Sequence, residues 1–403
     1  MNRSSLLISA ALALAAAGCG SNSSTQPDAS PSALDAAIAA DAAVQPGSDA
    51  GVQPQPDAQA AAGEDATVAS ASDAASASDA APASDASPAP GPDASAPPCT
   101  PASADAGVSS SGYPLDGWTW TRHGVLFEPP SGVIGDLAPT LALDGAALHV
   151  FFLRKSSATN HRLYHAVSRD GGSTWSVGAN PVTGLSDDGI DYPAALFEDG
   201  KFRLWYGSGT FGFAESADGD TWTVISAPVL RPGGTGTFDS MSLIYPAIAH
   251  DASGYQLLYT GYNGQGYSIG RADSADGKAF TRVGTGPVLA KGAAGEVDNH
   301  AVAQSAVVRA GKTWLVWYGA YDTSKTNPGP YRVALATSID GVTFQKRGLT
   351  LDLTASGTEA WSTRDPTVLR TASGWLMVYS GMGDDGRYRL FRATSTTCAP
   401  ADP

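Results

Sequence analysis

Apolar and polar residues alternate in short runs along residues 113–398, and these runs recur in five copies. Each copy starts with an apolar run, crosses a turn rich in Gly or Asp, and enters a second apolar run. The first residue of each copy and the aromatic residue near its second turn are 13 positions apart: Pro139 and Phe152, Pro193 and Tyr206, Pro246 and Tyr259, Ser305 and Tyr318, Pro366 and Tyr379. Short alternating runs between turn residues predict β-strands joined as hairpins.

A third run follows in every copy and ends in Ala-x-Ser. In the first four copies this tripeptide continues into x-Asp-Gly and then an aromatic residue, which is Trp175, Trp222, Phe280 or Phe344. Each copy therefore predicts four short strands. Repeats of roughly 50 residues with four strands each are typical of a β-propeller. The sequence predicts an all-β fold, a five-bladed β-propeller over residues 113–398.

The fifth copy stops after Ser395-Thr396-Thr397 and lacks the Asp-Gly turn and the fourth strand. The missing piece lies at the other end of the folded region. There Asp116-Gly117 precedes Trp118-Thr119-Trp120-Thr121-Arg122, just as Asp276-Gly277 precedes Phe280-Thr281-Arg282. The N-terminal strand is therefore expected to complete the last blade and close the ring, which leaves few open strand edges.

Residues 1–18 form a separate segment with the layout of a secretory signal. Arg3 is followed by an apolar run from Leu6 to Ala17, and Ala16-Ala17-Gly18-Cys19 resembles the bacterial lipoprotein box. The chain is therefore expected to be exported and lipidated on Cys19, which would anchor it in the outer membrane or at the cell surface. An ordinary signal peptide with an incidental Cys is the alternative, and the apolar run is too short for a transmembrane helix.

Residues 19–112 consist almost entirely of Ala, Ser, Asp and Pro, and residues 399–403 form a short tail. This composition buries too little apolar surface to offset the entropy of ordering, so a disordered linker is expected. Residues 1–112 hold 12 acidic residues and Arg3, a net charge of −11, so only −4 of the total of −15 belongs to the remaining residues. Neither part has a basic excess, so nucleic acid is not an expected partner, and the domain is expected to be a monomer.

Two further cysteines bracket the predicted propeller, because Cys99 lies before its first strand and Cys398 follows its last. Ring closure would bring these two ends of the domain together, and an exported protein meets oxidising conditions. A Cys99–Cys398 disulfide is one interpretation of this arrangement. Two free thiols, or thiols paired between molecules, are the other.

The Ser-x-Asp-Gly motifs point to structure rather than to chemistry. Ser168-Arg169-Asp170-Gly171, followed by Trp175, closely matches the Asp-box of sialidases. Asp-Gly favours a tight turn with positive φ, the Asp side chain bonds neighbouring amides, and the Trp packs between blades. The sequence lacks the Arg-Ile-Pro motif with which sialidases begin to bind a substrate carboxylate. A structural role is therefore expected.

Function is expected where the first strand of each blade begins, because side chains of all five blades point into the central channel there. The residues just before the repeated Pro differ between copies, as positions that carry chemistry can. Three of them are carboxylates, Asp136, Asp191 and Asp365. The candidate contacts to a ligand are Arg364, Tyr192, Tyr245, Gln304, His300, Asp298 and Trp361, with Tyr262 and Trp205 as further aromatic candidates.

Arg364-Asp365-Pro366 resembles the Arg-Asp-Pro motif of glycoside hydrolase family 32. The Ala-x-Ser-x-Asp-Gly-x-x-Trp ends of the copies are similar to those of the five-bladed arabinanase, levansucrase and invertase superfamily, which includes family 43. This resemblance covers about residues 113–398 and implies a carbohydrate ligand. It also implies that Asp365 stabilises the transition state and that Arg364 binds substrate. Asp191 is then the candidate general acid, and Asp136 the base or nucleophile.

The chain departs from the pattern of those families at two places. Gln304 stands before Ser305 where the families carry Asp before Pro, and Leu137 stands where they carry the Glu of the following blade. Two function classes therefore stay open, a glycoside hydrolase and a glycan-binding or scaffold propeller without catalysis. Carboxylates that face a pocket within reaction distance would favour hydrolysis. Carboxylates held in ion pairs would favour binding.

No metal site and no other cofactor are expected. The only histidines at metal-ligand spacing, His161 and His165, flank a predicted strand rather than lie on one helix face. The channels of some members of the superfamily hold a single Ca²⁺ or Na⁺, and that option stays open.

Overall fold

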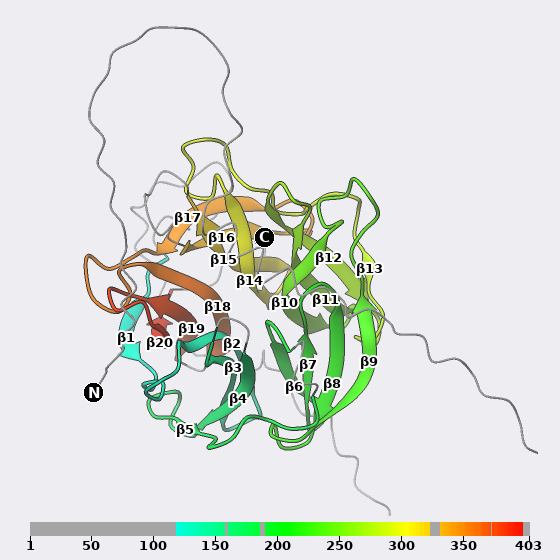
Figure 1. Cartoon of the computed structure of the whole chain (residues 1–403). Helices are drawn as coiled ribbons and strands as arrows, with labels where there is room; N and C mark the ends of the chain where they lie inside the picture. The colour runs from blue at the N-terminus through cyan, green and yellow to red at the C-terminus, as the bar shows by residue number, and fades with distance from the viewer. Residues whose placement is uncertain (1–117, 158–159, 186–189, 323–330, 372, 398–403) are drawn as a thin grey trace, which may run out of the picture.

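The computed structural model describes residues 118–157, 160–185, 190–322, 331–371 and 373–397 (Figure 1). Every regular element in these ranges is a β-strand, which confirms the predicted all-β class. The signal segment, the linker, the tail and the cysteines Cys19, Cys99 and Cys398 lie outside the described residues. Within the described ranges, no helix is long and apolar enough to cross a membrane.

The strands form five antiparallel modules, 1 to 5 in chain order, one for each sequence copy. Module 1 contains β2 (Gly135–Leu143), β3 (Leu148–Lys155), β4 (His161–Ser168) and β5 (Ser176–Val177). Module 2 contains β6 (Ala194–Glu198), β7 (Lys201–Tyr206), β8 (Phe211–Ser216) and β9 (Trp222–Leu230). Module 3 contains β10 (Ser242–Asp251), β11 (Gly254–Tyr262), β12 (Tyr267–Ser274) and β13 (Thr281–Arg282). Module 4 contains β14 (Ala301–Ala310), β15 (Thr313–Tyr321), β16 (Tyr331–Ser338) and β17 (Gln345–Leu351). Module 5 contains β18 (Ser362–Thr371), β19 (Gly374–Met382), β20 (Tyr388–Ser395) and β1 (Thr121–Val125).

Backbone hydrogen bonds gather these modules into three sheets. Modules 5 and 1 share a sheet because β2 runs parallel to β20, with Gly135 opposite Tyr388. Modules 3 and 4 share another sheet because β12 runs parallel to β14, with Tyr267 opposite Ala301. Module 2 is a sheet of its own, and none of the three sheets formed by the described strands closes on itself. The first strands contact one another in the order β2, β6, β10, β14, β18, and β18 contacts β2, so the modules surround a common centre (Figure 1).

The apolar core lies between neighbouring modules. All nine residues of β15 are buried, from Thr313 to Tyr321. β9, the last strand of module 2, instead exposes Val224 and Ile225. A strand that is covered on both faces reads as a continuous apolar run, which explains why the second strand of each copy is so apolar.

β1 pairs antiparallel with β20, with Thr121 opposite Thr394 and Val125 opposite Phe391. Just before β1, the ring of Trp118 packs edge-on against Trp317 of module 4 and Trp375 of module 5, at centroid distances of 5.2 and 5.4 Å. The N-terminal strand therefore lies beside the last strand of the chain, as the sequence predicts.

A repeated buried contact ties the loop before the first strand to the second strand in modules 3, 4 and 5. A tyrosine hydroxyl donates to a carboxylate 20 positions earlier in three pairs: Tyr259 to Asp239, Tyr318 to Asp298, and Tyr379 to Glu359. A cation on the fourth strand of each module neutralises the acid. Arg282 pairs with Asp239, Lys346 with Asp298, and Arg122 with Glu359. Arg122 belongs to β1. The N-terminal strand thus takes in module 5 the place that β13 and β17 take in modules 3 and 4.

The Ser-x-Asp-Gly motifs form the turns between the third and fourth strands of modules 1 to 4. In module 2, Ser216 Oγ accepts the N–H of Gly219 at 2.9 Å, and Asp218 Oδ1 accepts the N–H groups of Asp220 and Thr221 at 2.8 Å. These backbone hydrogen bonds hold the pKa of Asp218 below its usual value. The structural role predicted for these motifs is confirmed.

Candidate functional site

The residue directly before the repeated Pro or Ser has a left-handed backbone in all five modules. The φ angles are 50° for Ala138, 47° for Tyr192, 52° for Tyr245, 57° for Gln304 and 50° for Asp365. Residues other than Gly rarely adopt this conformation, which costs about 1–3 kcal/mol each and persists only where the surrounding structure enforces it. The strand register shifts at the same point in modules 1, 3, 4 and 5, and such a bulge redirects a side chain.

Side chains from four modules meet at this point. The rings of Tyr192 and Tyr245 lie 3.9 Å apart between centroids. Arg364 Nη2 donates to Tyr245 Oη at 2.7 Å, and the N–H of Asp365 donates to Gln304 Oε1 at 3.4 Å. The structure therefore brings together five of the residues selected from the sequence. We call Tyr192, Tyr245, Gln304, Arg364 and Asp365 the central cluster.

Arg364 is the only cation of the central cluster, and it is buried. Its Nε lies 3.3 Å from Asp365 Oδ2, and its guanidinium lies over the rings of Tyr331 and Tyr388 at 5.2 and 5.8 Å. Burial opposes the charged form, but the carboxylate of Asp365 and the tyrosines around the guanidinium together outweigh it and raise the pKa of Arg364. The arginine is therefore a permanent charge that neutralises Asp365.

Asp136 is held by a different arginine. Arg154 Nε and Nη2 each donate to one carboxylate oxygen of Asp136 at 2.8 Å, and Asp136 has no exposed surface. Burial raises the pKa of Asp136, and the hydrogen bonds and charge of Arg154 oppose this rise. Both oxygens are occupied, so Asp136 does not have the free carboxylate that the predicted base or nucleophile requires.

Asp191 is also ion-paired. His161 Nε2 lies 2.6 Å from Asp191 Oδ1, and Asp191 is 7% exposed. His161 belongs to β4 of module 1, whereas Asp191 precedes β6 of module 2. Each of the three predicted catalytic carboxylates thus has a cationic partner or a histidine beside it.

Two other predicted contacts are better explained by packing. Asp298 is 1% exposed and accepts from Tyr318 at 2.9 Å, with Lys346 Nζ at 2.8 Å. Modules 3 and 5 contain the same contact between a tyrosine and an acid. This repetition favours a structural role for Asp298 over a role in ligand binding. Trp205 is completely buried, and its indole N–H donates to the carbonyl of Gly277 at 2.7 Å. Its predicted role in stacking on a sugar is therefore wrong.

The residue five positions before the repeated Pro or Ser is exposed in modules 3 and 5. This position holds Met241, His300 and Trp361 in modules 3, 4 and 5, and we call these three the rim. The backbone N–H of each donates to the carbonyl of the last residue of the second strand, which is Tyr262, Tyr321 or Met382. Met241 is 63% exposed and Trp361 39%. Sequence reasoning selected His300 and Trp361 but missed Met241, although its place in the repeat could have identified it.

Two of these strands end in tyrosines, Tyr262 and Tyr321, that pack against aromatic side chains next to the rim. The ring of His300 packs edge-on against Tyr321 at 4.6 Å. Tyr262 stacks on Tyr267 of the next strand, also at 4.6 Å. Tyr262, a further aromatic candidate, therefore lies beside the rim.

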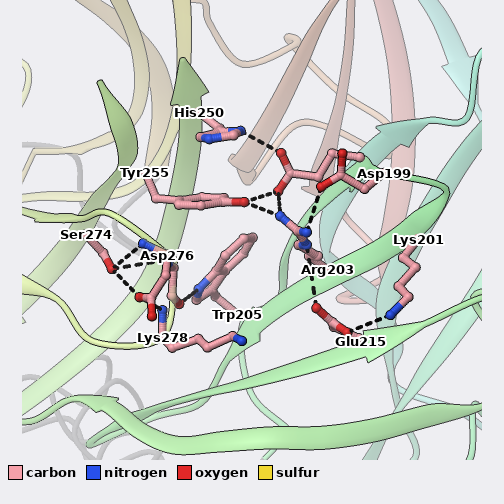
Figure 2. Close-up of polar contacts among 12 residues, drawn as sticks. Asp199, Lys201, Arg203, Trp205, Glu215, His250, Tyr255, Ser274, Asp276 and Lys278 are labelled. Carbon is pink, nitrogen blue, oxygen red and sulfur yellow. Dashed lines mark hydrogen bonds and ion pairs between the residues drawn. The ribbon is translucent and has the colours of Figure 1, made fainter. Parts of the chain in front are cut away.

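A second polar network joins modules 2 and 3 (Figure 2). Tyr255 Oη and His250 Nδ1 contact the two carboxylate oxygens of Glu198, each at 2.6 Å. The rings of His250 and Tyr255 stack at 3.9 Å, and Arg203 donates to Asp199 at 2.9 Å (Figure 2). These groups bind one another, so the network holds two modules together and presents no group aimed at a ligand.

No group of three or more His, Cys, Asp or Glu side chains within the described ranges could hold a metal ion.

No protein-family model matches the chain. Two uncharacterised proteins of Mycobacterium tuberculosis, MT1551 and Rv1502, are each 30% identical to it over 204 residues. The match covers 49% of this chain and 66% of each relative, so the chain spans just under two thirds of their length.

Solved structures with a similar fold are glycoside hydrolases. One glycoside hydrolase has a TM-score of 0.57 at 16% identity, over 70% of this chain and 94% of that chain. The catalytic domain of a GH62 α-L-arabinofuranosidase from Coprinopsis cinerea has a TM-score of 0.56 at 13% identity, over 70% and 99%. Zg3597, a family 117 glycoside hydrolase from Zobellia galactanivorans, has a TM-score of 0.53 at 14% identity, over 71% and 92%. The chain therefore shares the fold of these glycoside hydrolases, which is the fold that the resemblance implies.

Proposed function

We propose that this protein is a closed five-bladed propeller that binds a carbohydrate at the rim and the central cluster. The five modules, the pairing of β1 with β20 and the contact of β18 with β2 support the closed ring. The observation that carries the ligand site is the rim, where Met241 and Trp361 are exposed at equivalent places of two modules. Aromatic side chains offer an apolar face on which the C–H groups of a sugar ring can pack.

The polar half of the site is supplied by Gln304 Nε2, a buried atom without a hydrogen-bond partner among the described residues. An unpaired buried polar group costs about 1–3 kcal/mol, so a ligand that pairs this atom recovers the cost. A hydroxyl group both donates and accepts. A sugar hydroxyl can therefore accept the N–H of Gln304.

Glycan binding without cleavage is better supported than glycoside hydrolysis. Glycoside hydrolysis needs two carboxyl groups that are free to exchange protons or attack the sugar. Asp136 is bound by Arg154 through both oxygens, Asp191 lies against His161, and Asp365 lies against Arg364. Hydrolysis is the second candidate, and the fold that the chain shares with solved glycoside hydrolases favours it.

The test is a binding screen with plant and microbial oligosaccharides, followed by titration calorimetry on the best ligand. Trp361→Ala should weaken binding about tenfold, or about 1.4 kcal/mol. Ile339→Ala removes an exposed apolar side chain from an Asp-Gly turn and should leave the affinity unchanged. A protein that binds no glycan in the screen, or equal affinities for both variants, would refute the proposed site.

Chromatography of the glycan after incubation with the protein distinguishes binding from hydrolysis. A wild type that leaves the bound glycan intact supports the binding module. A wild type that shortens the glycan supports hydrolysis instead. Asp136→Asn, Asp191→Asn and Asp365→Asn should then each slow turnover by roughly 10²–10⁴-fold, as expected for loss of a positioned acid or base.

For the location we propose a lipoprotein of the cell envelope, in which the linker of residues 19–112 tethers a monomeric propeller to the outer membrane or the cell surface. Its support is the Ala16-Ala17-Gly18-Cys19 motif. Mass spectrometry of the mature protein should find an N-terminal Cys19 that carries lipid. An unmodified N-terminus, or one that starts elsewhere, would contradict the proposal.

A further inference from the structure

Two buried histidines of module 1 contact each other and a carboxylate on either side. His149 Nδ1 lies 2.8 Å from His165 Nε2. His149 Nε2 lies 3.0 Å from Asp144 Oδ2, and His165 Nδ1 lies 3.0 Å from Asp220 Oδ1. We call these four residues the histidine chain. Nothing in the proposed glycan site uses it.

The number of protons in the histidine chain decides which of its contacts can form. Three contacts need three protons, because each one requires a single hydrogen between its two heavy atoms. Two neutral imidazoles supply only two. His149 Nε2 is the nitrogen without a hydrogen-bond partner, so the contact to Asp144 is the open one.

One added proton fits the histidine chain, and a second does not. A proton on His149 Nε2 gives an imidazolium that bonds both Asp144 and His165. A second proton, on His165 Nε2, would place two N–H groups head to head between two buried cations. The two rings would then have to separate.

The surroundings do not offer an alternative partner. His149 and His165 are 5% and 4% exposed, and the rings packed on them are those of Phe202 and Phe151, each 4.6 Å away between centroids. The other charge that acts on His149 is Arg169. Burial lowers the pKa of His149, Asp144 opposes this effect, and His165 and Arg169 add to it.

The histidine chain crosses the border between modules 1 and 2. Asp220 lies in the Asp-Gly turn of module 2, and a Cβ on Gly219 would lie 2.7 Å from the ring of His165. Among the described strands, no ladder joins module 2 to module 1, because β6 to β9 form a separate sheet. The border depends instead on an isolated bridge between Thr183 and Thr221 and on side-chain contacts.

We propose that this border is a proton-responsive joint, in which the histidine chain accepts one proton and acid opens the contact between modules 1 and 2. Histidine side chains in an unfolded chain are protonated near the usual pKa of about 6.5. The folded chain accepts one proton fewer, so the stability that this site provides is full above about pH 6.5 and decreases as the pH falls.

Histidine titration by ¹⁵N NMR on the full chain tests the proton count directly. His149 and His165 should together take up one proton between pH 7.5 and 5. Uptake of two protons, or of none, would overturn the proposal.

Thermal unfolding tests the consequence for stability. Because the folded chain accepts one proton fewer than the unfolded chain, the wild-type Tm should decrease by roughly 2–4 °C for each pH unit below 6.5. His149→Gln should remove this part of the loss, because the remaining imidazole can be protonated alone. The matched control His250→Gln should keep the loss, since His250 pairs with Glu198 and no second imidazole. Equal pH profiles for the wild type and His149→Gln would overturn the proposal.

Hydrogen exchange locates the opening. After correction for the intrinsic pH dependence, acid should reduce protection in β6 to β9 before it does so in β10 to β17. Uniform loss of protection across the domain would contradict a joint at module 2.

Discussion

At the scale of single residues, an ion pair decides what one of the three predicted catalytic side chains does. Asp136 lies at the predicted place, but Arg154 stands directly opposite it in the ladder between β2 and β3. A hairpin places cross-strand neighbours in contact, so the strand register contained this pair. Sequence reasoning counted the carboxylates at the start of the first strands and missed the cation on the second strand of module 1.

The Asp136–Arg154 pair should be a large local contribution to stability. Asp136→Asn leaves the half-buried guanidinium of Arg154 without its buried charge partner and should lower the free energy of unfolding by about 3 kcal/mol. Asp273→Asn is the matched control, because Arg271 binds Asp273 through both oxygens in the same way but Asp273 is 41% exposed. That change should cost less than about 1 kcal/mol. Urea unfolding measures the free energy of unfolding of both variants. Equal decreases would show that burial does not determine how much such an ion pair stabilises the fold.

At the scale of elements, the repeat shows which positions hold the fold and which are free to vary. The Asp-Gly turns carry the same hydrogen bonds in modules 1 to 4, and the tyrosine–acid contact recurs in modules 3 to 5. The left-handed residue before the repeated Pro also recurs, yet its identity changes from Ala to Tyr, Gln and Asp. A conserved backbone shape with a variable side chain is what a ligand site on a repeated scaffold requires.

The Asp-Gly turns should also set part of the acid sensitivity of the fold. Hydrogen bonds from the amides of Thr343 and Val342, with the hydroxyl of Ser338, lower the pKa of Asp340 to about 2. Because the pKa of Asp340 is lowered, its ionised carboxylate stabilises the folded turn fully at pH values above the usual pKa of 3.8. This stabilisation is lost as the pH falls towards 2. Asp340→Asn should therefore lower Tm at pH 6 but show a smaller decrease between pH 4.5 and 2.5 than the wild type.

Asp384→Asn serves as the control for this experiment, because Asp384 is exposed, lies outside the Ser-x-Asp-Gly motifs and accepts, among the described residues, the N–H of Gly357 alone. Its pH profile should follow that of the wild type. A parallel profile for Asp340→Asn would contradict the role given to the turn.

At the scale of the whole molecule, the N-terminal strand is expected to hold the ring together. Deleting residues 113–124 removes Arg122, which neutralises Glu359, and Trp118, which packs between Trp317 and Trp375. The deletion should abolish a single cooperative thermal transition, because it exposes β20 and leaves a buried acid unpaired. Deleting residues 20–90, in the predicted linker, should leave Tm unchanged. If both deletions melt like the full chain, the closed ring is wrong.

The sequence by itself determined the strands, their grouping into five copies and the partner of the last strand. These features depend on alternation, turn residues and repeat spacing, which are local and survive without knowledge of packing. The residues of the central cluster were also found this way, because the repeat marks the beginning of each first strand.

Only the tertiary structure decided which polar residues are free to act. Asp298 has a repeated tyrosine partner 20 positions away, Trp205 bonds the carbonyl of Gly277 in another module, and Asp191 meets His161 across a module border. The contacts across modules join residues of different copies, and the closing of the fold brings them together. A periodic sequence fixes where a side chain emerges from its own strand, but the charge state and freedom of that side chain depend on neighbours that come from other strands.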